Sequence, residues 1–299
     1  MFITIFFLIN QQNMSTFEHY SKQSIFGSSF SKGTSSLCEQ IVNRLQNSDL
    51  LFVCCFDEGS RELGINHLES LKRQGIENYL AFIADRSTYN IVKSKGYNCQ
   101  RIDYQRPEIS SEKKTFGTPN FTEFSFVRYK YIHEKLKQYK AVWYMDVDTV
   151  VLENLNKTFL EYSGKGYDIV FQDDIHQIQN CTGCQLYFSS QKALDMTIHI
   201  YNGMNNSMPD QHYVNFFLQR NPGIFKTTMF DRNEFPNGLL YFENRFLIQL
   251  NEEFSEHKKT YEKSCKQVLD KHTKFVHANW MVGIQTKIDA LKDKGLWYI

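Results

Sequence analysis

Residues 141–152 read AVWYMDVDTVVL, and this stretch decides both the expected fold and the expected chemistry. The five apolar residues 141–145 predict a buried strand, and Asp146 and Asp148 follow at its carboxyl end. Open α/β sheets bind ligands at the carboxyl ends of their strands. Two carboxylates spaced i, i+2 there can share Mn²⁺ or Mg²⁺ and leave positions open for a diphosphate. A solvated acidic turn is the alternative, because Asp-x-Asp is a common pattern.

Apolar runs alternate with amphipathic segments on both sides of this strand. Further strands are predicted at 49–56, 79–84, 97–102, 168–171, 185–188 and 274–277. Helices are predicted at 67–75, 87–95, 121–139, 193–201, 211–218 and 286–294, with Ser87 as the cap of the second. The alternation of strands and helices before residue 102 implies a parallel sheet with helices on its faces.

The length allows one large domain or two small ones, and the sequence 49–299 holds no convincing linker, so one domain is predicted there, after a poorly ordered or peripheral segment 1–48. Of the 299 residues 41% are hydrophobic, and 34 basic residues nearly balance 33 acidic ones. This balance disfavours a nucleic-acid partner. The apolar run 1–9 reaches only about 14 Å, so no integral membrane span is expected. We therefore expect a soluble, cytoplasmic protein; a degenerate anchor, and with it the lumen of the secretory pathway (Golgi), is the alternative.

Short motifs surround Asp146-Val-Asp148 in a particular order. They are FVRYK at 126–130, NCTG at 180–183, DQHYVN at 210–215, FPNG at 235–238 and HANW at 277–280. From residue 49 to residue 299 the chain resembles the nucleotide-diphospho-sugar transferase family, of the glycosyltransferase family 77 type and related to family 8. The resemblance implies a GT-A fold, which is a Rossmann-like mixed sheet flanked by helices. It also implies metal-dependent, retaining transfer of a sugar from a UDP-sugar to a glycan or glycoprotein acceptor.

Five residues are expected to hold the metal ion and to act at the anomeric carbon. Asp146, Asp148 and His277 are the expected metal ligands, since His277 ends a short strand and a neutral imidazole binds Mn²⁺. The resemblance places Asp210 and Gln211 beside the anomeric carbon. There a carboxylate can stabilise an oxocarbenium-like centre and an amide can bond the sugar. The alternative for Asp210 is a helix N-cap.

Donor-binding residues are also expected where the other strands end. Phe56, Asp57 and Asp85 follow the first two strands, where a base and ribose rest in such sheets. Core packing is the alternative for Phe56. Asp173 and Asp174 follow a later strand and could contact hydroxyls of the donor sugar; the alternative is that they are plain surface acids.

A second group of expected donor-binding residues lies near the acidic pair and in the C-terminal tail. Arg128 is expected to reach the diphosphate, and Lys287, in the last helix, to steady the leaving nucleotide. Val147 lies between the two metal-binding aspartates. Asn279 and Gly283 belong to the tail motif that carries the resemblance.

Two other functions remain open at the level of the sequence. Residues 146–150 (DVDTV) also resemble the signature of haloacid-dehalogenase-like phosphatases, with Asp146 as nucleophile and Asp148 as acid/base. That class needs a well-separated acidic pair, whereas Asp173-Asp174 lies only 27 residues after Asp146. The other alternative is a non-catalytic module that binds a nucleotide sugar.

Two expectations concern the exposure of particular side chains. Asp148 is expected at a solvent-facing site, so that replacing it by asparagine should abolish transfer with little change in stability. His67, His133, His199 and His257 are expected on helix surfaces.

Overall fold

The computed structural model describes residues 49–102, 119–175, 179–203, 208–247, 259 and 272–299. All of these residues belong to one compact unit that spans residues 44–299. The expectations for residues 1–48 and for His257 lie outside the described residues. Within the described ranges, every helix is too short or too polar to cross a membrane.

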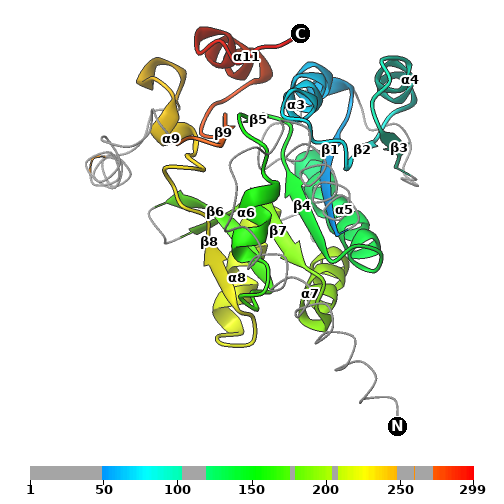
Figure 1. Cartoon of the computed structure of the whole chain (residues 1–299), viewed down its shortest axis with the longest axis vertical. Helices are drawn as coiled ribbons and strands as arrows, with labels where there is room; N and C mark the ends of the chain where they lie inside the picture. The colour runs from blue at the N-terminus through cyan, green and yellow to red at the C-terminus, as the bar shows by residue number, and fades with distance from the viewer. Residues whose placement is uncertain (1–48, 103–118, 176–178, 204–207, 248–258, 260–271) are drawn as a thin grey trace, which may run out of the picture. The chain divides into compact units, whose positions relative to one another are not determined.

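A mixed seven-stranded sheet forms the centre of this unit (Figure 1). In spatial order its strands are β3 (Cys99–Arg101), β2 (Tyr79–Ile83), β1 (Leu50–Phe56), β4 (Ala141–Met145), β7 (Gln179–Phe188), β6 (Ile169–Ile175) and β8 (Thr227–Met229). β7 runs antiparallel to both of its neighbours, and every other adjacent pair is parallel. The α/β class and the mixed sheet are therefore confirmed.

Helices cover both faces of the sheet, which explains why β1 is apolar throughout. Leu50, Phe52 and Cys54 face a core with residues of α3 (Arg61–Arg73), α4 (Arg86–Ser94) and α6 (Asn156–Tyr162). Leu51, Val53 and Cys55 face a second core with residues of α5 (Pro119–Leu136), α7 (Gln191–Asn202) and α8 (Asp210–Arg220). Because successive side chains alternate between these faces, both halves of the run are buried.

A small second sheet lies beyond the carboxyl end of β4. Its strands β5 (Thr149–Val151) and β9 (Phe275–His277) are antiparallel, with Thr149 opposite His277. Val150 and Val276 pack in a third core with residues of α3 and of α11 (Ile284–Asp293). Figure 1 shows β5 and β9 beside α3 and α11. This pairing joins the C-terminal part of the chain to the segment that carries the acidic pair.

The remaining short elements connect these parts. They are η1 (Glu58–Ser60), α9 (Gly238–Tyr241) and η2 (Asn244–Phe246). Asn237 is the N-cap of α9, and its side chain accepts a hydrogen bond from the backbone N–H of Leu240.

Most predicted elements are present, and the differences have local causes. Strands β6 and β7 are longer than predicted and pair with each other, so Asp173 and Asp174 lie within β6. The cap of α4 is Asp85 and not Ser87, because the carboxylate of Asp85 accepts a bond of 2.8 Å from the backbone N–H of Thr88. Helix α3 begins at Arg61, six residues before the predicted start at His67.

Candidate active site

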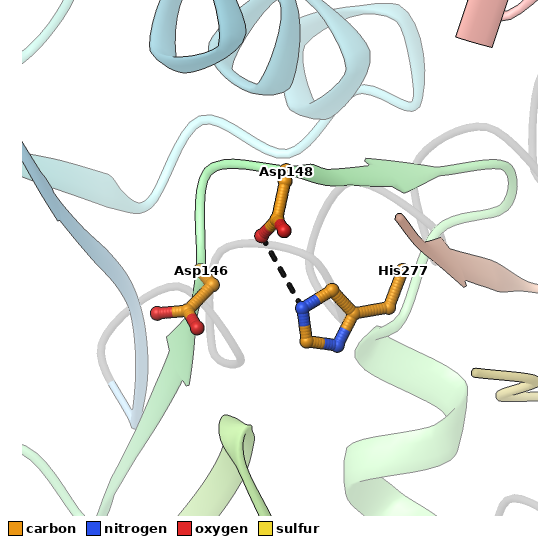
Figure 2. Close-up of side chains that lie close together, drawn as sticks. All are labelled: Asp146, Asp148 and His277. Carbon is orange, nitrogen blue, oxygen red and sulfur yellow. Dashed lines mark ion pairs between the residues drawn. The ribbon is translucent and has the colours of Figure 1, made fainter. Parts of the chain in front are cut away.

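Three side chains from two distant segments converge beyond the end of β4. The ligand atoms of Asp146, Asp148 and His277 all lie within 4.8 Å of one another, and Figure 2 shows the three side chains close together, with Asp148 and His277 directed toward each other. Asp148 Oδ1 is 3.2 Å from His277 Nε2. The convergence follows from the pairing of β5 with β9, since the N–H of Ala278 also donates to the carbonyl oxygen of Asp148 (2.8 Å). The three residues expected to bind metal are thus adjacent.

The orientation of His277 suits a metal ligand. The side-chain amide of Gln172 donates to the carbonyl oxygens of Phe235 and Pro236, at 3.2 and 3.0 Å. Its Oε1 therefore faces His277 Nδ1, 2.7 Å away. Because Oε1 can only accept, Nδ1 carries the hydrogen, and in the neutral ring Nε2 keeps a free lone pair. That lone pair faces Asp148, and a fixed imidazole of this kind is typical of metal-ligating histidines.

Gly183 leaves the space that an ion would fill. A Cβ atom at this position would lie 2.4 Å from His277 Cε1 and 2.7 Å from Asp146 Oδ2. Any other residue would therefore occupy the volume between two of the three ligands. Two carboxylates and one imidazole around such a space fit a divalent cation such as Mn²⁺.

Replacing Gly183 by alanine is expected to prevent binding of a divalent cation while the fold is retained. The added methyl group occupies the space beside His277 and Asp146, and stability should fall by about 1–3 kcal/mol from overpacking. Thermal unfolding with and without Mn²⁺ measures both effects. Gly59→Ala is the control, because its Cβ meets only Asp57 Oδ1 at 3.5 Å. A Gly183→Ala protein that Mn²⁺ stabilises as strongly as the wild type would contradict the assignment.

Asp148 is buried and paired, which contradicts the expectation of a solvent-facing carboxylate. Asp148 is 7% exposed, and the Nζ atom of Lys287, on α11, lies 2.5 Å from Oδ2 of Asp148. Burial alone would raise the pKa of Asp148, but the positive charge of Lys287 beside it holds the pKa well below its usual value. Asp148 is therefore ionised, and Lys287 is the cation nearest to it.

Arg128 connects Asp146 with Asp210. Its guanidinium, on α5, donates from one terminal nitrogen to Asp146 Oδ1 (2.8 Å) and from the other to Asp210 Oδ2. The hydroxyl of Tyr144 also donates to Asp146 Oδ1 (2.7 Å), and that of Tyr129 donates to Asp210 Oδ2 (3.1 Å). Burial raises the pKa of Asp146, and the positive charge of Arg128 opposes this shift. Arg128 therefore lies between a candidate metal ligand and a candidate catalytic residue.

Asp210 is the first residue of α8, and Pro209 occupies the N-cap position. The carboxylate of Asp210 is buried against Arg128, so the capping alternative does not describe it. Arg128 is expected at the diphosphate, and in the structure its partners are the two carboxylates of Asp146 and Asp210.

Asp174 joins Gln211 to the C-terminal tail. Its Oδ2 accepts a bond of 2.8 Å from Gln211 Nε2, and its Oδ1 accepts from the Trp280 indole N–H (2.9 Å) and from Asn279 Nδ2 (3.2 Å). Gln211 Oε1 also accepts from the N–H of Thr182 (3.2 Å). Burial raises the pKa of Asp174, opposed by these donors. The amide of Gln211 is thus held at both ends.

Asp173 and Asp174 are both buried, so the alternative of plain surface acids is wrong. Trp280 follows Asn279 with a φ of 61°, a left-handed conformation that costs energy for any residue except glycine. Trp280, whose indole N–H donates to Asp174, is a residue of the site that is not among those expected from the sequence.

The residues after β1 and β2 form a separate group, engaged in local structure. Phe56 is fully buried, and its ring lies against the backbone of Gly64, so core packing describes its position. Asp85 accepts bonds from the N–H groups of Thr88 and Glu58, both at 2.8 Å, and Ser60 Oγ donates to Asp57 (3.1 Å).

Val147 and Gly283, the last two expected donor-binding residues, differ in how much they are exposed to solvent. Val147 is half-buried in the turn between the two aspartates. Gly283 precedes α11, is exposed, and has a φ of 90°, which favours glycine.

Gln172 and His67 are buried polar residues near the cluster of Asp146, Asp148 and His277, and neither is among the residues expected at the site. The sequence around each of them nevertheless holds a signal of burial. Gln172 begins the polar run QDD directly after the apolar residues IVF of β6. His67 was expected on a helix surface, but it is buried. It lies four residues before Leu71 and next to Leu68, on the apolar face of α3, and this spacing predicts burial.

Comparisons with known proteins indicate the family of the chain. Residues 74–291 match the family model of nucleotide-diphospho-sugar transferases. The UDP-galactose:fucoside alpha-3-galactosyltransferase of Dictyostelium discoideum is 22% identical, over 87% of this chain and 45% of its own length. The chain therefore spans less than half of that relative.

Two solved glycosyltransferases share the fold. GlyE of Streptococcus pneumoniae TIGR4 has a TM-score of 0.51 at 12% identity, over 84% of this chain and 65% of its own. The galactosyltransferase LgtC, solved with donor and acceptor sugar analogs, has a TM-score of 0.50 at 13% identity, over 76% of this chain and 86% of its own. These likenesses confirm the GT-A fold. Since the family model matches more than half of the residues, the chain belongs to the nucleotide-diphospho-sugar transferase family.

Proposed function

We propose that residues 49–299 are the catalytic domain of a metal-dependent, retaining glycosyltransferase that moves a sugar from a UDP-sugar to a glycan or glycoprotein acceptor. The observation that carries the proposal is the convergence of Asp146, Asp148 and His277 around the space left by Gly183. Mn²⁺ or Mg²⁺ held there would neutralise the charge of the diphosphate as it is bound and as it leaves. Lys287, beside Asp148, supplies a second positive charge for the leaving nucleotide.

Asp210 and Gln211 are the proposed catalytic residues on the sugar side of the site. The buried carboxylate of Asp210 provides negative charge near the developing positive charge of the anomeric centre. Arg128 holds that carboxylate toward Asp146 and thus toward the diphosphate. Asp174 and the N–H of Thr182 fix the amide of Gln211, which is proposed to bond the donor sugar.

The remaining donor contacts are proposed from position. Asp57 and Asp85 lie at the carboxyl ends of β1 and β2, where a ribose would rest. Val147, Asn279 and Gly283 lie in the two segments that carry the metal ligands. Asp173 adjoins the Asp174 network from within β6.

A donor screen by nucleotide release tests this function. UDP-galactose is the first donor to try, because the Dictyostelium relative is named for it. We expect release of UDP from one UDP-sugar in the presence of Mn²⁺, faster with a fitting acceptor and suppressed by EDTA. The anomeric configuration of the product, read by NMR, tests retention. Release that EDTA leaves unchanged would contradict the role of the metal ion.

Replacing His277 by alanine is expected to weaken Mn²⁺ binding and turnover together. The two aspartates persist, so raising the concentration of Mn²⁺ should restore part of the activity. The melting temperature should also fall, because His277 is 2% exposed and loses its bond to Gln172. The measurement is turnover against Mn²⁺ concentration.

His133→Ala is the matched control for the His277 variant. His133 Nδ1 bonds the carbonyl oxygen of Leu194 (3.1 Å) on the far side of the sheet from β9. This variant should lose stability without any change in its dependence on Mn²⁺. If His277→Ala shows the same Mn²⁺ dependence as the wild type, His277 is a packing residue.

A further inference from the structure

Helix α3 buries a histidine directly behind the acidic turn. His67 is 1% exposed and lies among the buried leucines of the helix, Leu63, Leu68 and Leu71. A buried imidazole is costly unless it is hydrogen-bonded. Its Nδ1 lies 3.0 Å from Thr149 Oγ1 and 3.2 Å from the carbonyl oxygen of the same residue. The buried polar contact of His67 is therefore with the residue that follows Asp148.

The bonding of Thr149 fixes the direction of this contact. The hydroxyl of Thr149 donates its hydrogen to the carbonyl oxygen of Asp146 (2.6 Å), so it can only accept from His67. The carbonyl oxygen of Thr149 also only accepts. His67 Nδ1 must therefore carry the hydrogen and donate to both. Burial lowers the pKa of His67 to about 4, which keeps the ring neutral near pH 7.

The contact fixes the backbone that carries all three ligand side chains. The hydroxyl of Thr149 holds the carbonyl oxygen of Asp146 by a hydrogen bond. Thr149 also lies opposite His277 in the antiparallel pair of β5 and β9. One turn further along α3, Ser70 Oγ accepts from the N–H of Val151 (3.1 Å). Helix α3 thus holds β5 at two alternate residues, and the bond from His67 is the one at the acidic turn.

We propose that His67 is a positioning residue for the metal site: by donating to Thr149 it fixes the turn between Asp146 and Asp148 and so sets the affinity for a divalent cation. This inference rests on the proposed function, because it requires a cation between these carboxylates. It assigns a role in the site to a side chain that touches neither the cation nor the substrate.

Binding of Mn²⁺ alone to the full chain tests the inference, with the free ion followed by electron paramagnetic resonance. In His67→Asn the side-chain Nδ2 takes the place of Nδ1 and can still donate to Thr149. In His67→Gln the amide lies one bond further out, and in His67→Leu the donor is absent. We expect the Asn variant to keep the affinity of the wild type. The Gln and Leu variants should lose on the order of 10-fold or more, as is typical when a partner that orients a metal site is removed.

Asn66→Leu is the matched control for a general loss of stability. Asn66, the neighbour of His67 on α3, bonds the carbonyl oxygen of Leu296 (3.1 Å) and the N–H of Tyr298 (2.6 Å), away from the turn. Its melting temperature should fall while its affinity for Mn²⁺ stays unchanged. The same loss of affinity in Asn66→Leu as in His67→Leu would overturn the inference.

The other outcomes are equally decisive. If His67→Gln and His67→Leu bind Mn²⁺ like the wild type, His67 has no positioning role, although the proposed metal site stands. If His67→Asn loses as much affinity for Mn²⁺ as His67→Leu, the loss comes from the smaller volume of the side chain and not from the missing hydrogen-bond donor. The inference then fails. If the wild type itself does not bind Mn²⁺, the proposed metal site fails first. Should His67→Leu not fold, the Asn and Gln variants decide the question.

Discussion

Asp148→Asn is expected to lower sugar transfer by roughly 10³-fold or more. The change removes a charged ligand from a site whose cation would stabilise the departing diphosphate by several kcal/mol, and about 1.4 kcal/mol corresponds to a factor of ten. The free energy of unfolding should also fall, by about 1–3 kcal/mol, because Lys287 and His277 lose a charged partner. Turnover at saturating Mn²⁺ and urea unfolding measure the two effects.

Asp168→Asn is the control that separates the effect on turnover from the effect on stability. Asp168 is also a buried aspartate, but it precedes β6 and accepts from Ser190 Oγ (2.7 Å) and from the N–H of Lys226 (2.9 Å), at the opposite end of the strand from Asp174. The Asp168→Asn variant should have a lower free energy of unfolding than the wild type and the same turnover. Near-wild-type transfer by Asp148→Asn in Mn²⁺ would show that Asp148 is not a metal ligand.

Arg128→Met is expected to have the largest effect on stability, a loss of about 3–5 kcal/mol in the free energy of unfolding. The change leaves the buried carboxylate of Asp210 and the partly exposed carboxylate of Asp146 without the cation between them, and a buried charge such as that of Asp210 is strongly destabilising when it loses its partner. Adding Asp210→Asn to this variant should cost less than the sum of the single changes, because the second change removes one of the stranded charges. Urea unfolding of the two single variants and the double variant measures this coupling.

Arg61→Met is the control for the loss of an arginine. Arg61 pairs with Glu58 at 3.7 Å on the surface, where an ion pair contributes about 0–1 kcal/mol. Additive losses in the Arg128 and Asp210 variants would contradict the bridge that Arg128 forms between the metal side and the sugar side of the site.

The long apolar runs make the parallel half of the sheet predictable. β1, β2 and β4 are buried on both faces, so their sequences are continuously apolar and their ends are marked by acidic residues. The pairing of β6 with β7 could not be read in the same way. Both strands carry polar residues such as Gln172 and Gln185 in buried positions, where other side chains and backbone carbonyls satisfy them. The three-residue strands β5 and β8 give no periodic signal at all.

The ligand set of the candidate site was predictable in part, because its carboxylates follow a strand and His277 ends another. The space among these ligands was not predictable from the sequence. It depends on the absence of a side chain at Gly183, which comes near the ligands only because β7 pairs with β4. The partners of Arg128 were not predictable either, since Asp210 lies 82 residues away along the chain. Such contacts depend on the packing of α5 against α8, which local patterns do not encode.

The phosphatase alternative is wrong, because the chain belongs to a family of sugar transferases. The acidic pair that this alternative needed has another place in the fold: Asp174 bonds Gln211, Asn279 and Trp280. Turnover of a nucleotide sugar separates the proposed function from the alternative of a non-catalytic binding module.

Calorimetric titration of UDP into the protein, once with Mn²⁺ and once with EDTA, measures whether a metal ion links the three ligand residues to the diphosphate. If Asp146, Asp148 and His277 hold a cation that bridges to the diphosphate, UDP should bind at least about tenfold more tightly with Mn²⁺ than with EDTA, equivalent to roughly 1.4 kcal/mol. Gly183→Ala should abolish that difference. Equal affinity for UDP with Mn²⁺ and with EDTA would show that no metal ion bridges these residues and the diphosphate.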